Sequence, residues 1–155
     1  MSKIVLLNEF LSIRKKIKNK KIVFTNGCFD ILHSGHVKYL EQAKGLGDIL
    51  IIGINSDDSV RKLKGDSRPI NTLNDRAYVL SGLTIVDYII AFDELTPLKL
   101  ISQVLPDILV KGGDYKIDEI VGNDFVEKNG GIVKTVPYLD GASTTDIINK
   151  IKEMT

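Results

Sequence analysis

The sequence predicts an α/β fold, a single doubly wound domain with a five-stranded parallel sheet and helices on both faces. Short apolar runs rich in β-branched residues alternate with segments of helical spacing along the whole chain. Gly, Asp, Asn or Pro bound these runs, as is typical of strand ends. With 155 residues and 43% hydrophobic content, the chain has the size of one domain that buries its own core.

The elements follow one another in a regular order. A helix from about Leu6 to Ile17, within residues 3–18, precedes a core over about residues 20–152. The apolar runs predict strands at Lys21–Thr25, Ile49–Ile54, Tyr88–Ala91, Ile108–Val110 and Ile132–Val136. Helical spacing or helix start signals predict helices at Gly35–Leu46, Asp57–Leu63, Leu73–Leu83, Pro97–Leu105 and Gly122–Asn129. Isoleucines at helical spacing after a Ser-Thr-Thr cap predict a last helix over Thr144–Lys152.

Charge and composition exclude several classes of protein. The net charge of +1, from 21 basic and 20 acidic residues, gives no global field for nucleic acid or an anionic membrane. The basic run Arg14–Lys21 has no interleaved aromatics, so we interpret it as a solvated helix end rather than a nucleic-acid patch. No apolar run approaches the roughly 20 residues that cross a bilayer, and the N-terminus does not resemble a secretion signal. We expect a cytoplasmic protein with neither nucleic-acid nor membrane partners.

The two histidines of the chain, His33 and His36, lie together after the first predicted strand, with Gly35 between them. Unpaired N–H groups and the helix dipole favour an anion at a helix start. Imidazoles spaced i and i+3 face one side of the first turn and can donate to phosphate oxygens during phosphoryl transfer. Zinc needs a third and usually a fourth ligand, so we expect no metal on this pair. Lys38, one turn further, is expected to reach the phosphates.

Further polar clusters follow the other strands, and in a doubly wound sheet the ligand lies beyond these carboxyl ends. Asn55–Asp57 follow the second strand, Lys111–Asp114 the fourth and Asp140–Thr145 the fifth. The Lys-Gly-Gly loop is either an ordinary turn or a place of close approach to a ligand. The Ser143-Thr144-Thr145 run either caps the last helix or binds a second phosphate.

A basic segment, Arg61–Pro69, occupies the middle of the chain. Its default interpretation is a solvated surface. Alternatively, Lys64 and Arg68 belong to a loop that closes over an anionic substrate. Arg76 lies early in a helix, where a cation opposes the dipole, and this suggests an anionic partner.

Three other site types are disfavoured. The only cysteine, Cys28, excludes an internal disulfide, and without a separate histidine and carboxylate it is better interpreted as a small packing residue than as a nucleophile. A Walker-type loop is missing, which disfavours P-loop kinases and GTPases. The dinucleotide fingerprint Gly-x-Gly-x-x-Gly is also missing after the first strand, which disfavours oxidoreduction.

The run His33-Ser34-Gly35-His36 resembles the signature of the HxGH nucleotidyltransferase superfamily. The lead-in Gly27-x-Phe29-Asp30, Asn55–Asp57, Arg76 and Ser143–Thr145 follow in the order of its cytidylyltransferase-like branch, over about residues 20–151. Within that branch the chain is most similar to D-glycero-β-D-manno-heptose 1-phosphate adenylyltransferases. The stretches that carry this likeness are 63–71, 109–115 and 119–122.

The resemblance implies a Rossmann-like domain that moves AMP from ATP to a sugar 1-phosphate with release of pyrophosphate. It implies Mg²⁺ on the triphosphate, a homodimer, and a separate sugar kinase that supplies the acceptor. It implies catalytic roles for His33, His36 and Lys38. The implied nucleotide-binding residues are Asn26, Gly27, Cys28, Phe29, Gly35, Asn55, Asp57, Gly112, Asp114, Ser143, Thr144 and Thr145. The implied substrate-binding residues are Lys64, Arg68, Arg76 and Lys111.

Other functions stay open at this stage. Glycerol-3-phosphate cytidylyltransferases carry an arginine where this chain has Tyr138, and Met-Gly-Asp-Asp in place of Lys111–Asp114. A nucleotide-binding sensor domain would keep the pocket without catalysis. A truncated class I aminoacyl-tRNA synthetase shares the histidine signature, but the chain lacks a Lys-Met-Ser-Lys-Ser-type loop.

Overall fold

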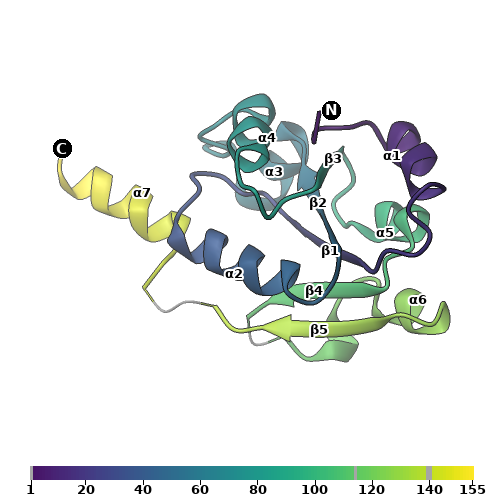
Figure 1. Ribbon diagram of the computed structural model, residues 1–155. Coiled ribbons are helices and arrows are strands. Elements are labelled where there is room, and N and C mark those ends of the chain that lie inside the picture. Colours follow the sequence, from purple (N-terminus) through teal and green to yellow (C-terminus); the bar gives the residue numbers. More distant parts are fainter. Residues whose placement is uncertain (1, 114, 139–140) are drawn as a thin grey trace.

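The computed structural model describes residues 2–113, 115–138 and 141–155. An all-parallel sheet of five strands in the order β3-β2-β1-β4-β5 forms its centre, as Figure 1 shows. The strands are β1 Ile22–Gly27, β2 Ile49–Asn55, β3 Tyr88–Phe92, β4 Ile108–Gly112 and β5 Ile132–Val136. The predicted α/β fold with a five-stranded parallel sheet is therefore confirmed.

Four strands continue past their predicted carboxyl ends. β1 includes Asn26 and Gly27, which pair with Gly53 and Ile54 of β2, and β4 includes Lys111 and Gly112. These residues have low intrinsic strand preference, and the pairing ladder determines their conformation. The extension brings polar residues of the predicted site onto the sheet itself.

The helices are α1 Leu7–Arg14, α2 Ser34–Lys44, α3 Asp57–Lys64, α4 Leu73–Ser81, α5 Leu98–Val104, α6 Asn123–Lys128 and α7 Thr144–Glu153. A short 3₁₀ helix, η1 Ile117–Glu119, was not predicted. The first helix is shorter than predicted because the chain after Arg14 continues in tighter i→i+3 turns, with Ile17 N–H donating to the carbonyl of Arg14.

Helices cover both faces of the sheet, as predicted. On one face, Leu40 and Ala43 of α2 and Leu80 of α4 pack against β1 and β2. On the other face, the core is built by residues of α1, α5 and α6, among them Phe10 and Ile101. Side chains of each strand alternate between these two cores. α2 and α5 consequently lie on opposite faces.

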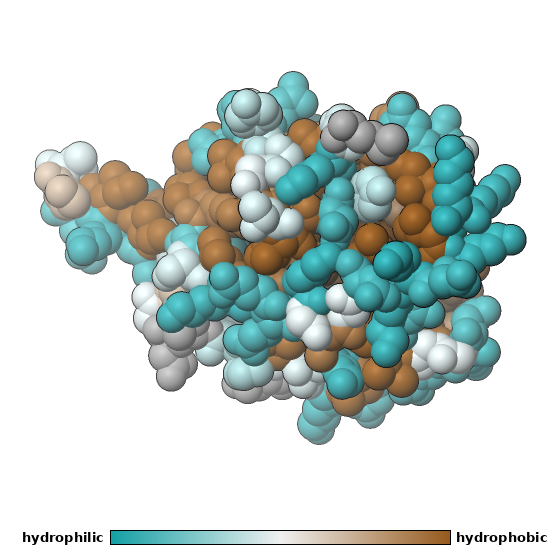
Figure 2. Space-filling view, viewed as in Figure 1, coloured by the Kyte–Doolittle hydropathy of each residue, from teal (hydrophilic) through white to brown (hydrophobic). Residues whose placement is uncertain are grey.

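The last helix is present, but its apolar stripe does not join the core. α7 buries none of its residues and projects from the body, and Figure 2 shows hydrophobic side chains along it. Ile151 is 55% exposed and Met154 is 78% exposed. Only the beginning of α7 lies against the rest of the chain, next to the start of α2 (Figure 1).

In the part of the chain that the structure describes, no helix combines the length and apolar composition that would let it cross a bilayer.

The sheet order determines where a ligand can bind. β1 lies in the middle and pairs with β2 on one side and with β4 on the other. The chain segments that leave β1 and β4 run in opposite directions. They leave a crevice between them at the carboxyl ends of these two strands.

Candidate active site

A cavity of about 760 Å³ opens at this crevice. Its walls come from the β1–α2 turn, the ends of β2 and β4, the loop after α3, the start of α5 and the start of α7. The volume is that of a typical small-molecule site. Segments far apart in the sequence thus converge on one space.

His33 and His36 cap the start of α2 in a reciprocal arrangement. The Nδ1 atom of His33 accepts a hydrogen bond from the Gly35 N–H at 3.1 Å, and the Nδ1 atom of His36 accepts one from the His33 N–H at 3.2 Å. The two rings stack with their centroids 3.9 Å apart. This is a capping box in which imidazoles replace the usual hydroxyl and carboxylate.

The capping bonds determine which nitrogen of each ring carries the proton. Burial, with a contribution from His33, lowers the pKa of His36 to about 4, and burial lowers the pKa of His33. Both rings are therefore neutral at pH 7. A neutral imidazole that accepts a hydrogen bond at Nδ1 carries its proton on Nε2. Both histidines line the cavity, so each offers it an Nε2–H donor.

The turn before these histidines is strained. Phe29 and Ile31 have positive φ angles of 49° and 44°. The left-handed region is unfavourable for any side chain and most of all for a β-branched one such as Ile31. Such strain persists only where surrounding contacts hold it.

Asp30, between the two strained residues, provides these contacts. Its buried carboxylate accepts hydrogen bonds from Nε of Arg68 at 2.8 Å and from the N–H groups of Ile70 and Asn71 at 2.7 and 2.9 Å. Burial opposes ionisation, but these hydrogen bonds hold the pKa of Asp30 below its usual value. The Thr144 hydroxyl donates to the Asp30 carbonyl at 2.9 Å. Asp30 therefore joins the histidine turn to the basic loop and to α7.

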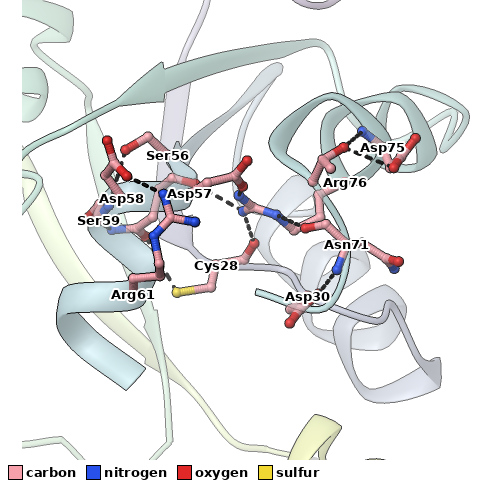
Figure 3. Close-up of polar contacts among 12 residues, drawn as sticks. Cys28, Asp30, Ser56, Asp57, Asp58, Ser59, Arg61, Asn71, Asp75 and Arg76 are labelled. Carbon is pink, nitrogen blue, oxygen red and sulfur yellow. Dashed lines mark hydrogen bonds and ion pairs between the residues drawn. The ribbon is translucent and has the colours of Figure 1, made fainter. Parts of the chain in front are cut away.

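Arg76 ties the floor of the site together (Figure 3). Its guanidinium donates to the carbonyls of Cys28 and Asn55 at 2.6 and 2.9 Å and pairs with the Asp57 carboxylate at 2.8 Å. Its Nε donates to the carbonyl of Asn71 at 3.0 Å. Arg76 is only 2% exposed. The anionic partner suggested by the sequence is Asp57, so Arg76 braces the cavity wall from behind.

Three cationic side chains do line the cavity: Lys64, Arg68 and Lys111. Arg68 is held by Asp30 through Nε, which orients its outer N–H groups without using them. Burial lowers the pKa of Lys111, whose ammonium lies 5.9 Å from the centre of the Tyr115 ring. This cluster concentrates positive charge in one place on a nearly neutral protein.

The start of α7 faces the same cavity. The Ser143 hydroxyl accepts from the Asp146 N–H at 3.1 Å, which confirms its predicted capping role. Ser143, Thr144 and Thr145 all line the cavity. The N-termini of α2 and α7 thus converge, and both favour an anion.

The glycine pair at the end of β4, Gly112 and Gly113, permits close packing of an aromatic ring. A Cβ added at Gly112 or Gly113 would lie 2.7 or 2.5 Å from ring carbons of Tyr138. Gly113 also has a φ of 93°, which other residues rarely adopt. The Lys-Gly-Gly loop is therefore no ordinary exposed turn, because it forms a surface on which Tyr138 lies.

Most of the residues implied by the resemblance line the cavity. They are Asn26, Gly27, Cys28, Phe29, His33, Gly35, His36, Asn55, Lys64, Arg68, Lys111, Gly112, Ser143, Thr144 and Thr145. Lys38 is exposed on α2, and neither it nor Asp57 nor Arg76 is among the lining residues. Asp114 lies outside the described residues.

The chemistry of Cys28 fits a packing residue. Burial raises the pKa of its thiol, and Sγ donates to Oδ1 of Asn55 at 3.8 Å. The thiolate needed for nucleophilic attack is therefore disfavoured. Among the residues that the structure describes, no group of three or more His, Cys, Asp or Glu side chains is placed to hold a metal ion.

Sequence reasoning missed a large part of the lining. The missed residues are Asp30, Tyr39, Leu63, Leu95, Thr96, Pro97, Leu109, Tyr115, Glu119, Ile120, Val121, Tyr138 and Ala142. Most are apolar or aromatic residues whose pattern in the sequence resembles that of any core or surface residue. A signal existed for some of them. Asp30 lies within the Gly27-x-Phe29-Asp30 lead-in, Tyr138 stands where the glycerol-3-phosphate enzymes carry an arginine, and Glu119 lies in one of the stretches that carry the likeness to the heptose enzymes.

Comparisons with known proteins identify the family of the chain. Residues 24–150 match the model of the cytidylyltransferase-like family. The chain is 57% identical over 147 residues to the bifunctional protein HldE of Campylobacter concisus, covering 95% of this chain and 30% of that protein. It is 60% identical over 140 residues to HldE of Haemophilus ducreyi, covering 89% of this chain and 30% of that protein. The chain thus spans less than a third of the length of these relatives.

Solved structures with the same fold include the lipopolysaccharide core biosynthesis protein of Thermoplasma volcanium. That protein is 36% identical, with a TM-score of 0.64 over 77% of this chain and 97% of that one. The pantoate-β-alanine ligase of Francisella tularensis has a TM-score of 0.65 over 99% of this chain and 78% of that one. At 21% identity this second likeness shows the fold alone.

The lowered pKa of the partly buried His36 predicts a pH-dependent stability. Because the folded pKa of His36 is about 4, below the ordinary 6.5, the unfolded chain binds more protons between these values, and stability rises with pH in that window. Gln at this position keeps the capping bond but does not titrate. Denaturant titrations should show the stability advantage of the native chain over His36→Gln shrinking as pH falls from 7 to 4.5. A pH-independent difference would contradict the assigned pKa.

Arg76→Met should destabilise the fold by about 3 kcal/mol or more, because it leaves the buried Asn55 carbonyl, the partly buried Cys28 carbonyl and Asp57 without their partner. Arg61 is the matched control, since it pairs with Asp58 on the exposed surface of α3. Arg61→Met should cost less than about 1 kcal/mol. Chemical denaturation measures both values, and equal losses would show that the Arg76 contacts add nothing.

Proposed function

Because the chain belongs to the cytidylyltransferase-like family, we propose that it moves AMP from ATP to D-glycero-β-D-manno-heptose 1-phosphate, releasing pyrophosphate and forming ADP-heptose. The observation that carries the proposal is the pair of neutral histidines. Both rings line a cavity that also holds three cations and two helix N-termini, and their capping bonds leave Nε2–H as the donor of each ring. That arrangement suits a phosphate chain whose charge is redistributed during the reaction.

The proposed reaction is a single in-line displacement. An oxygen of the sugar 1-phosphate forms a bond to the α-phosphorus of ATP as the bond from that phosphorus to the bridging oxygen breaks, and the electron pair leaves with pyrophosphate. The attacking phosphate is already ionised at neutral pH, so no general base is needed. The protein contributes by positioning both phosphates and stabilising the developing charge.

Each part of the cavity has a proposed role. His33 and His36 donate to the phosphate oxygens of ATP around the reacting phosphorus, and the start of α7 holds the β and γ phosphates. Lys64, Arg68 and Lys111 bind the phosphate of the acceptor, with Arg68 already oriented by Asp30. Gly112 borders the nucleoside, and the family resemblance implies the same role for Asp114.

Mg²⁺ is proposed to arrive on the triphosphate oxygens, where it neutralises charge on the leaving pyrophosphate. This ion keeps several waters and takes few protein ligands, which fits a cavity whose described lining holds no cage of metal-ligating side chains. We also propose a homodimer. The acceptor carries its phosphate on the anomeric oxygen, so a sugar kinase reaction must supply it.

The choice of sugar is supported by relatives rather than by contacts. Two HldE proteins are 57% and 60% identical to this chain, and the Thermoplasma relative is described by its role in lipopolysaccharide core biosynthesis. A cytidylyltransferase for glycerol 3-phosphate would instead be expected to carry an arginine where Tyr138 packs on the glycine pair. The proposal therefore favours the sugar acceptor.

The proposal is tested by pyrophosphate release with ATP or CTP against heptose 1-phosphate or glycerol 3-phosphate. We expect turnover with ATP and heptose 1-phosphate. His36→Ala should reduce that turnover by at least about a hundredfold, because it removes a donor at the reacting phosphate while leaving the sheet intact. Circular dichroism and a melting curve control for folding. Activity confined to CTP with glycerol 3-phosphate would refute the choice of substrate, and near-normal turnover in His36→Ala would remove the histidine from the mechanism.

A further inference from the structure

The cavity has a second end that the phosphate chemistry does not explain. On the side of the sheet that carries α5, its lining is mostly apolar and comes from the end of α3, the loop before α5 and the residues after η1. Leu63, Leu95, Pro97, Ile120 and Val121 form this wall. The histidines and the start of α7 lie at the other end, next to α2.

One carboxylate, Glu119, lines this apolar end. Among the described residues its carboxylate has no hydrogen bond or ion pair, and its side chain is exposed. The other acidic lining residue in the described chain, Asp30, is buried and already bonded to Arg68, Ile70 and Asn71. Glu119 is therefore the acidic group in the described lining that remains available to a ligand.

The backbone holds Glu119 in a defined place. Its N–H donates to the carbonyl of Lys116 at 3.0 Å within η1. The next residue, Ile120, is only 7% exposed and is packed in the core with Ile101 and Leu109. The carboxylate thus stands at the cavity wall on a short, anchored helix.

An acidic group in this position does not bind the phosphates. It repels them, whereas Lys64, Arg68 and Lys111 attract them. A carboxylate accepts hydrogen bonds only, so its ligand must present donors, and apolar side chains beside it suit the C–H face of a carbohydrate. We propose that Glu119 binds hydroxyl groups of the acceptor and so selects a polyhydroxylated phosphate substrate. The inference rests on the proposed function, because it assumes that the acceptor fills this end of the cavity.

Steady-state kinetics of Glu119→Ala and Glu119→Gln test the assignment. Hydrogen bonds to a charged group predict a rise of at least about tenfold in the KM for the sugar 1-phosphate in Glu119→Ala, with the KM for ATP changed by less than about twofold. The KM of Glu119→Gln for the sugar 1-phosphate should lie between those of the native enzyme and Glu119→Ala, because the amide oxygen still accepts a hydrogen bond. Asp118→Asn is the matched control, since Asp118 is exposed on the same 3₁₀ helix but does not line the cavity.

Deoxy analogues of the acceptor separate recognition from a structural effect. With the native enzyme, kcat/KM should be about tenfold or more lower for at least one deoxy sugar 1-phosphate than for the parent sugar. With Glu119→Ala the difference should be much smaller, because this variant already lacks the hydrogen bond to the missing hydroxyl. An unchanged KM for the acceptor, an equal rise in the KM for ATP, or recovery of Glu119→Ala at high Mg²⁺ would overturn the assignment. The last result would indicate a metal ligand.

The two proposals fail in different ways. If the native enzyme uses glycerol 3-phosphate rather than a sugar 1-phosphate, the proposed function is wrong. The role of Glu119 is then tested by comparing the native enzyme and Glu119→Ala on glycerol 3-phosphate and on its analogue without the 2-hydroxyl. If a sugar 1-phosphate is turned over and Glu119→Ala matches Asp118→Asn, only the role of Glu119 is wrong. Turnover of no hydroxylated acceptor would overturn both.

Discussion

The two hydrogen bonds that close the first turn of α2 are the constraint on which the site depends. They occupy Nδ1 of His33 and of His36 with backbone N–H donors, so each neutral ring carries its proton on Nε2. A glutamate in place of His36 would cap the helix as well, but its carboxylate would offer a phosphate no donor. The same bonds that stabilise the helix therefore supply its chemistry. Burial keeps both rings neutral, which avoids placing two like charges on rings whose centres are 3.9 Å apart.

The remaining polar contacts hold this turn in a strained conformation. Asp30 joins it to the basic loop and to α7, and Arg76 fixes the carbonyls of Cys28 and Asn55 beneath it. Both side chains lie at or below 2% exposure, where a lost partner is costly because the buried group left behind cannot be hydrated. Lys64 and Lys111 have no such partner among the described contacts, and Arg68 keeps its outer N–H groups for a ligand.

The sheet and most helices could be predicted because apolar periodicity reflects burial directly, and the histidine signature could be located because its residue types are rare in this chain. Arg76 was expected at the ligand because a cation early in a helix suggests an anion, and only the fold shows that Asp57 is that anion. Glu119 and Tyr138 lie at positions that the family resemblance marks, but only the fold shows that both reach the cavity. The isoleucines of α7 have the spacing of a core helix, yet they remain largely outside the core, because periodicity indicates an apolar face but not what covers it.

The central claim is that both histidines present a neutral Nε2–H to the nucleotide. Long-range ¹H–¹⁵N correlation spectra of the imidazole rings at pH 7, with and without a nonhydrolysable ATP analogue, test it most directly. The account predicts that in the free protein both rings show a protonated Nε2 and an unprotonated Nδ1. It further predicts that the Nε2 resonances are the ones that shift when the analogue binds. A proton on Nδ1 of either ring, or an imidazolium at this pH in the free protein, would contradict the account.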